Sequence, residues 1–184
     1  DIPLNDSKCY QLFTRAFTTG IFQFESSGMR KFLRDLKPTN FEDIVAAIAL
    51  FRPGPASNIN TYIRRKEGKE KVIYLDSSLE PILKKTYGIM IYQEQVMQTV
   101  SYYAGYTLGE ADILRRAISK KKKDVLIEEE ERFLRKAKNL GKDENISKEL
   151  FAQILKFAGY GFNRSHAVAY SMVAYKMAYL KVHY

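Results

Sequence analysis

Cysteine and histidine are scarce in this sequence, and the shortage limits what the protein can be. Cys9 is the only cysteine, and His166 and His183 are the only histidines. One cysteine cannot form an internal disulfide, which agrees with a cytoplasmic protein because the cytoplasm keeps thiols reduced. These three residues also lack the spacing of a zinc site, so we expect no metal ligands in this chain.

The sequence patterns of two common kinds of active site are missing as well. The chain has no Gly-x-x-x-x-Gly-Lys phosphate loop and no pair of carboxylates placed for two metal ions. It has no uncharged apolar run of about 18 residues, the length that spans a bilayer. The apolar stretch after His166 contains Lys176 and Lys181. We therefore expect no catalytic residue here, no membrane partner, and no activity of this chain by itself.

The sequence has an excess of positive charge. The net charge is +9, and 46% of the residues are hydrophobic. This composition predicts a folded globule with an anionic partner, most often nucleic acid; a solvated basic surface is the alternative. The chain has no initiator Met, and its last helical segment runs to Tyr184 without Gly, Asn or Pro to end it. We therefore expect a piece of a longer protein.

Helical signals dominate the chain. Thr39–Glu42 and Thr107–Glu110 each have the Ser/Thr-x-x-Glu pattern of a capping box, and we expect Asp124 to cap a further helix. Pro53 and Pro55 end the first of these helices. In the last helix, small residues recur at i, i+4, i+7 and i+11, a spacing that lets another backbone approach closely. They are Ala167, Ser171, Ala174 and Ala178.

Three short apolar runs are the candidates for strands. They are residues 20–25, 72–75 and 88–92. Runs this short do not separate a strand from a buried turn. The sequence therefore predicts a mainly α fold with a few short strands. We expect a helical N-terminal part over residues 1–56, a mixed part over 57–92 and a second helical part over 93–184.

The strongest local feature is a run of cations that contains no acid. We call it the basic ridge; its members are Arg115, Arg116, Lys120, Lys121, Lys122 and Lys123. If one helix continued through the ridge, Arg116, Ser119, Lys120 and Lys123 would share a face. So many like charges repel each other, which favours phosphate contact, although a solvated basic face stays open as the alternative. Asp112 lies close to the two arginines, which suggests an ion pair.

A second feature is the segment Gly159–His166, which we call the glycine motif. Its two glycines allow positive φ or close backbone approach. Asn163 or Ser165 can cap the helix that follows, and the first amides of that helix would favour an anion. The aromatic rings of the motif offer flat surfaces for a base. The alternative is an ordinary connection between helices with buried aromatic side chains.

Six motifs in this order and spacing resemble the fingers domain of the C-family bacterial replicative DNA polymerases, the DNA polymerase III alpha subunits. They are Gly20–Met29, Ala49–Pro55, Tyr87–Met97, Gly105–Asp112, Leu114–Ala117 with Lys120–Lys123, and Phe157–His166. The resemblance covers nearly the whole chain. Residues 61–78 match less closely, and Asp76-Ser77-Ser78 stands near the point where the family has His-Pro.

The resemblance implies a fingers domain cut out of a larger polymerase, whose palm outside this chain would bind two magnesium ions. The triphosphate of the incoming nucleotide would be held by Arg115, Arg116 and Lys120. The pocket for the nascent base pair would be lined by Asn163, Ser165, His166 and Tyr170. Weaker candidates for contact with DNA or phosphate are Arg52, Gln93, Gln95, Lys121, Lys122, Lys123 and Arg164.

The resemblance also implies the partners. They would be primer–template DNA, deoxynucleoside triphosphates and the rest of the polymerase chain, with the sliding clamp and other replisome proteins bound through domains outside this chain. Two other functions stay open. A free-standing basic module would bind any duplex and ignore nucleotides. A docking domain would use the basic ridge and the small residues of the last helix to bind an acidic protein.

Overall fold

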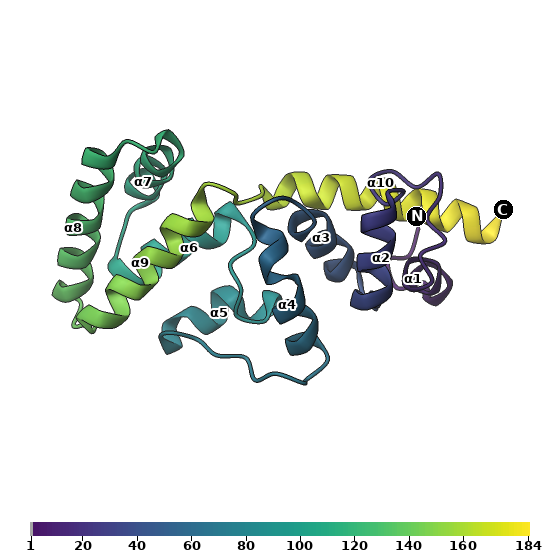
Figure 1. Cartoon of the computed structure of the whole chain (residues 1–184), viewed down its shortest axis with the longest axis horizontal. Coiled ribbons are helices and arrows are strands. Elements are labelled where there is room, and N and C mark those ends of the chain that lie inside the picture. Colours follow the sequence, from purple (N-terminus) through teal and green to yellow (C-terminus); the bar gives the residue numbers. More distant parts are fainter. Residues whose placement is uncertain (1) are drawn as a thin grey trace. The chain divides into compact units, whose positions relative to one another are not determined.

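The computed structural model describes residues 2–184, apart from the side chain of Ala158. Every regular element of the described residues is helical: ten α-helices and three short 3-10 helices (Figure 1). The prediction of a mainly α fold is confirmed. The expected strands are absent from residues 20–25, 72–75 and 88–92, which form turns and irregular chain apart from an isolated bridge at Tyr92. In the first run, Ile21 N–H bonds to Thr18 O and Phe24 N–H to Ile21 O, and these turns replace a strand ladder.

The chain divides into two compact units. Unit 1 contains Asp1–Lys69 and Phe162–Tyr184, and unit 2 contains Glu70–Gly161. This division differs from the three consecutive parts expected from the sequence, because the last helix returns to pack against the first part of the chain. The glycine motif crosses from unit 2 to unit 1 between Gly161 and Phe162.

Unit 1 is built around a buried helix. Its helices are α1 (Ser7–Thr14), α2 (Ser27–Leu36), α3 (Phe41–Leu50), α4 (Ile59–Lys66) and α10 (Arg164–His183). Helix α3 is almost wholly apolar and is buried from Asp43 to Leu50. Helix α10 packs on α3 and α1, and the small residues predicted to allow close approach are all buried. Ala and Ser at these positions let the helix backbones come close together.

Ion pairs and helix-capping hydrogen bonds stabilise the ends of the helices in unit 1. Asn40, one position after the expected Thr39, caps α3 and accepts a 3.0 Å bond from Asp43 N–H. The Asp43 carboxylate accepts from Thr39 N–H at 2.8 Å and lies 3.4 Å from Lys66 Nζ. Lys66 also donates to the backbone oxygens of Leu36 and Lys37, at the end of α2. One buried carboxylate therefore links α3 to the end of α4, and Lys66 links that end to α2.

Unit 2 has a core of aromatic and aliphatic side chains. Its helices are α5 (Glu80–Leu83), α6 (Gln93–Ala104), α7 (Leu108–Lys120), α8 (Lys123–Asn139) and α9 (Glu144–Ala158). The ring of Phe133 stacks on Tyr103 at 5.9 Å and tilts against Phe151 at 5.3 Å. Burial of these rings contributes to the hydrophobic stabilisation that holds α6, α8 and α9 together.

The starts of α7 and α8 differ in how well the sequence predicted them. Thr107 and Glu110 form the predicted capping box, with bonds of 3.2 Å and 2.8 Å in the two directions. Asp124 does not cap α8, which begins at Lys123 after Lys122 without a side-chain cap. Asp124 instead lies in the first turn, where a carboxylate still favours the helix dipole. Gly105, at φ 70°, ends α6 in the left-handed region.

Candidate nucleic-acid interface

The basic ridge lies at the end of α7 and in the turn that follows, not on one helix face. Helix α7 stops at Lys120, and Lys121 takes a left-handed φ of 51°. Lys122 is extended, and Lys123 begins α8. The expected face of Arg116, Ser119, Lys120 and Lys123 is therefore wrong, because the helix breaks between its third and fourth members. The turn nevertheless keeps the four lysines consecutive and exposed.

Asp112 holds both arginines of the ridge, as the sequence suggested. Its Oδ1 accepts from Arg115 at 2.8 Å, and its Oδ2 lies 2.7 Å from an Arg116 nitrogen. The hydrogen bond from Arg115 and the two positive charges hold the pKa of the Asp112 carboxyl below its usual range. The Arg116 side chain is 68% exposed, against 30% for Arg115. The Arg116 side chain therefore projects into solvent, and its ion pair with Asp112 fixes its orientation.

The four lysines of the ridge form no ion pair within the described residues. Lys121 Nζ lies 5.8 Å from the centre of the Tyr160 ring, a cation–π contact. A Cβ on Gly159 would lie 3.9 Å from Lys121 Cε. The end of the ridge thus meets the first residues of the glycine motif inside unit 2, a contact that spacing along the sequence did not reveal.

The two glycines of the motif, Gly159 and Gly161, differ in how much space surrounds the Cβ position. A Cβ on Gly161 would lie 2.9 Å from Gln93 Cγ and 3.4 Å from Gln93 N, so this position needs glycine for a close approach to α6. Neither Gly159 nor Gly161 has a positive φ. Gln93 is half-buried against Gly161. Its side chain therefore helps to pack the motif against the first turn of α6.

The N-cap and the first turn of α10 carry three of the four predicted pocket residues. Asn163 Oδ1 caps the helix and accepts from the N–H groups of Ser165 at 2.9 Å and His166 at 3.3 Å. These two amides are already bonded, so they are not the free anion site that the sequence suggested. The side chains of Asn163, Ser165 and His166 are exposed. Tyr170 lies one turn further, its ring centre 6.0 Å from that of His166.

Two arginines flank the start of α10 within unit 1. The Arg52 guanidinium lies over the Phe162 ring at 4.8 Å. Arg164 donates to Glu42 Oε1 at 2.5 Å, and both side chains are partly exposed. The ion pair offsets part of the Arg164 charge, so Arg52 and Arg164 together give this end of α10 a moderate positive potential.

Gln95 has a structural role. It is 6% exposed, and its Oε1 accepts from the N–H groups of Ile91 at 2.8 Å and Tyr92 at 3.0 Å. Its Nε2 donates to Ile82 O and Thr86 Oγ1. Both the acceptor and the donors of the amide are thus used inside unit 2, which leaves nothing for DNA. The sequence does not show the partners that bury Gln95.

The predicted residues form two groups in different units. Arg115, Arg116 and Lys120 belong to unit 2, and the residues of α10 belong to unit 1. The sequence did not point to Phe22, whose exposed ring contacts Tyr170 edge-on at 5.4 Å. The sequence offered one signal for Phe22, because it stands two residues before Phe24. Two aromatic side chains that close together in a turn need not both be buried.

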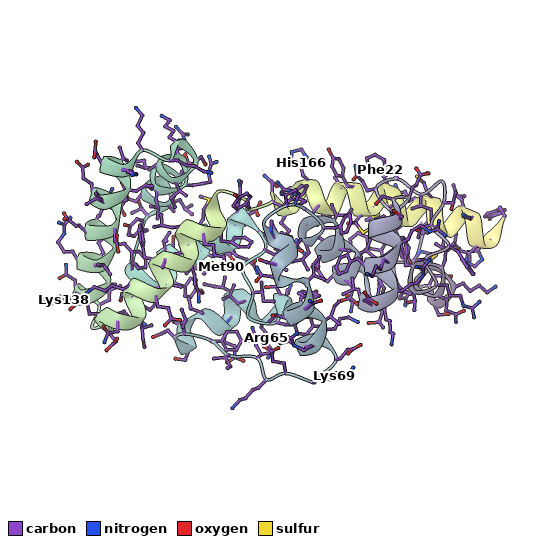
Figure 2. All side chains as sticks on the ribbon, viewed as in Figure 1. Phe22, Arg65, Lys69, Met90, Lys138 and His166 are labelled. Carbon is purple, nitrogen blue, oxygen red and sulfur yellow. The ribbon has the colours of Figure 1, made fainter. Side chains whose placement is uncertain are left out.

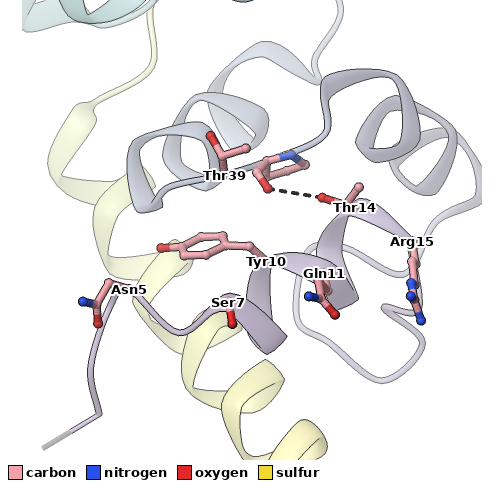
Figure 3. Close-up of a pocket in the computed structure, with 8 residues that line it drawn as sticks. Asn5, Ser7, Tyr10, Gln11, Thr14, Arg15 and Thr39 are labelled. Atoms are coloured by element: carbon pink, nitrogen blue, oxygen red, sulfur yellow. Dashed lines mark hydrogen bonds between the residues drawn. The ribbon is translucent and has the colours of Figure 1, made fainter.

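A separate pocket of about 360 Å³ lies beside α1 in unit 1 (Figure 3). One wall is fixed by Thr14, whose hydroxyl donates to Pro38 O at 3.2 Å. The pocket is lined by Asn5, Ser7, Tyr10, Gln11, Thr14, Arg15, Pro38 and Thr39. None of the site residues predicted from the sequence lines it.

Within the described part of the chain, every helix is too short or too polar to span a membrane.

Comparison of the sequence with known proteins identifies the family of the chain. Residues 1–141 match the family described as the bacterial DNA polymerase III alpha subunit finger domain. The chain belongs to this family. It is 55% identical over 183 residues to the DNA polymerase III subunit alpha of Halalkalibacterium halodurans and 56% identical over 183 residues to that of Staphylococcus epidermidis. The matches cover 100% of this chain but only 16% and 17% of those two relatives.

Proposed function

We propose that this chain binds the incoming deoxynucleoside triphosphate and the primer–template duplex as part of a template-directed DNA polymerase in chromosomal replication. The observation that carries the proposal is the basic ridge: two arginines oriented by Asp112 beside four lysines that have no acidic partner among the described residues. Guanidinium groups complement phosphate oxygens in charge and geometry. Among the substrates of a polymerase, the triphosphate has the highest density of negative charge.

The ridge supplies the contacts to phosphate in this proposal. Arg116, the more exposed arginine, reaches the triphosphate, and Arg115 and Lys120 complete the charge around it. Their positive charge also stabilises the charge that develops as pyrophosphate leaves. Lys121, Lys122 and Lys123 contact phosphates of the DNA, since all three are exposed to solvent.

The exposed residues of α10 supply the contacts to the nascent base pair. Asn163 keeps its amide nitrogen for the nucleotide, because its oxygen is used as the helix cap. Ser165 offers a hydroxyl, and His166 and Tyr170 offer ring faces on which a base can stack. Arg52 and Arg164 add positive charge near this pocket.

The described residues do not fit a magnesium site. They contain no group of three acidic, histidine or cysteine side chains that could hold an ion. Asp112, which contacts the two arginines of the ridge, is occupied by both of them. We therefore place the metal ions on the palm of the larger polymerase and derive no step of this chain through them. Replication of a bacterial chromosome takes place in the cytoplasm, where a lone cysteine such as Cys9 stays reduced.

The test is Arg116→Ala in the full-length polymerase that contains this chain. Loss of a charge-assisted phosphate contact should raise the nucleotide KM about 10-fold and lower turnover as well. Arg135→Ala is the matched control, since Arg135 is an exposed arginine on α8 outside the ridge. If KM and turnover of the Arg116 variant equal those of the control, the ridge does not hold the triphosphate.

A basic module without a catalytic role predicts a different result for this chain alone. Fluorescence anisotropy of a labelled primer–template, measured across salt, should then show salt-sensitive binding that is indifferent to nucleotide. A pocket that works as proposed should bind more tightly when the templated nucleotide and magnesium are added. Absence of binding at low salt would instead favour the docking domain.

A further inference from the structure

The loop between α1 and α2 turns Phe22 outward. Its neighbours Ile21 and Phe24 are 1% and 0% exposed, whereas Phe22 is 37% exposed. Thr18 Oγ1 donates to Phe24 O at 2.6 Å and closes the loop. Gln23 takes a φ of 68°, a conformation that costs free energy in a residue other than glycine. The loop thus bends sharply, and the bend fixes the direction of the exposed Phe22 ring.

The same loop is fastened to α10 at two points. The Phe22 ring meets the Tyr170 ring edge-on, with centres 5.4 Å apart and an angle of 90° between planes. Further along α10, Lys181 Nζ donates to Thr19 O at 2.7 Å. In Figure 2 the labelled Phe22, from the loop, and His166, from α10, both lie beside the ribbon of α10. Phe22 therefore keeps its place relative to Tyr170, although the two residues are far apart in the sequence.

Three aromatic side chains now form a connected and exposed surface. The Tyr170 ring contacts both the Phe22 ring, at 5.4 Å between centres, and the His166 ring, at 6.0 Å. All three side chains are exposed to solvent. In an edge-to-face contact the edge of one ring meets one face of the other, so each pair of rings keeps faces that its partner does not cover, and a flat group can stack on those that face solvent. Since Arg164 and Arg52 bring positive charge to the start of α10, the flat partner that fits is a base of an anionic nucleotide.

We infer that Phe22 is a third aromatic residue of the nucleotide pocket: it positions the Tyr170 ring and closes one side of the surface on which the base of the incoming nucleotide stacks. This inference rests on the proposed function. Without the Phe22 edge, Tyr170 can rotate between rotamers, and nucleotide binding must then order it. The loss falls on binding of the nucleotide and leaves the chemical step largely unchanged.

The experiment compares Phe22→Leu and Phe22→Tyr in the full-length polymerase. Phe22→Leu should raise the nucleotide KM about 3-fold to 10-fold, with kcat within about 2-fold, because an aromatic edge contact is lost while apolar volume is kept. Phe22→Tyr keeps the ring edge and should restore the KM. Phe17→Leu is the control: Phe17 lies in the same loop, is 59% exposed and makes no ring contact among the described residues.

Two outcomes would overturn the inference. In one, Phe22→Leu leaves KM unchanged while His166→Ala and Arg116→Ala raise it; the proposed function then stands and Phe22 lies outside the pocket. In the other, Phe22→Leu lowers the melting temperature and kcat to the same degree as Phe17→Leu, which makes Phe22 a residue of loop stability alone. If His166→Ala and Arg116→Ala also leave KM unchanged, the proposed function itself fails.

Discussion

Asp112 and Arg116 form a 2.7 Å ion pair on α7, and the same carboxylate accepts a 2.8 Å bond from Arg115. The pairs run at i,i+4 and i,i+3, so both arginines reach back along the helix to one acid. This geometry lowers the net charge of the ridge and limits the directions that the two guanidinium groups can take. A polyanion must therefore compete with Asp112 or bind the guanidinium donors that Asp112 leaves free.

Removal of that carboxylate should tighten binding of DNA to this chain. In Asp112→Asn the two arginines lose their anionic partner and become available to phosphates, so affinity at low salt should rise and fall more steeply with salt. Anisotropy of a labelled duplex across salt measures both effects. Glu144→Gln is the control, because it removes a carboxylate paired at i,i+4 with Lys148 on α9 and changes net charge equally. Equal curves for the two variants would mean that the freed arginines do not reach the DNA.

Gly161→Ala should destabilise unit 2. A Cβ there would lie 2.9 Å from Gln93 Cγ, so the glycine motif or α6 must shift, at a cost of about 1–3 kcal/mol in the free energy of unfolding. Gly159→Ala is a matched control, since the nearest atom to its Cβ is the flexible Lys121 Cε at 3.9 Å.

Denaturant titrations of both glycine variants measure the difference. Adding Gln93→Ala to Gly161→Ala should recover part of the loss, because it removes the closest of the three contacts and leaves Gln93 N at 3.4 Å and Gln93 Cα at 3.5 Å. Equal stability of Gly161→Ala and Gly159→Ala would contradict the close approach.

Local signals in the sequence predicted the helices, but contacts between distant residues decided where several of them begin and end. The capping box of Thr107 and Glu110 involves residues three apart, so its pattern alone was sufficient. The break after Lys120 has no comparable signal. Lys121 takes the left-handed conformation usually filled by glycine, and its contact with Tyr160 comes from 39 positions further on the chain.

In the candidate site, too, the sequence predicted local contacts but not contacts between distant residues. Asp112 and its arginines lie within one helical turn, so spacing sufficed to pair them. Gln95 was misjudged because its partners include Ile82 and Thr86, which precede α6 and fold back onto it. Phe22 was missed because a loop far from α10 in sequence brings it against Tyr170. Such contacts follow from tertiary packing, which composition and periodicity do not report.

Acid should weaken the junction of α7 and α8 through Glu110. The bond from Thr107 N–H, with the cations of Lys136 and Arg132, lowers the pKa of Glu110 from 4.5 to about 2. A carboxyl whose folded pKa is depressed contributes stability that is complete above its unfolded pKa and is lost as pH falls through the folded value. The contribution should therefore disappear between about pH 4.5 and pH 2.

Glu110→Gln tests this assignment. Glutamine can still accept from Thr107 N–H but cannot pair with Arg132 at 2.6 Å or Lys136 at 3.0 Å. The variant should be less stable at neutral pH and should lose less stability on acidification, as measured by melting temperature against pH. Glu149→Gln, an exposed change on α9, is the control. A variant that follows the acid dependence of the parent would assign that dependence to other carboxyls.

Two buried serines should respond in opposite directions to the same change. Ser171 is 0% exposed in α10, and its Oγ has no hydrogen-bond partner among the described residues. Ser147 is 1% exposed, and its Oγ bonds to Tyr103 OH at 2.9 Å and to Asp143 O at 2.7 Å. Ser171→Ala removes an unsatisfied polar group with almost no change in volume and should stabilise the protein by about 1 kcal/mol.

Ser147→Ala should destabilise the protein by about 1–3 kcal/mol, because it leaves the buried Tyr103 hydroxyl without its partner. Chemical denaturation of both variants gives the two free energies directly. Ser171→Val is a third variant: the added methyl groups should clash on the buried face of α10, which packs on α3 and α1, at a cost of about 1–3 kcal/mol. Destabilisation by Ser171→Ala would mean that its hydroxyl is bonded in solution, and stabilisation by Ser171→Val would mean that α10 is not closely packed at this position.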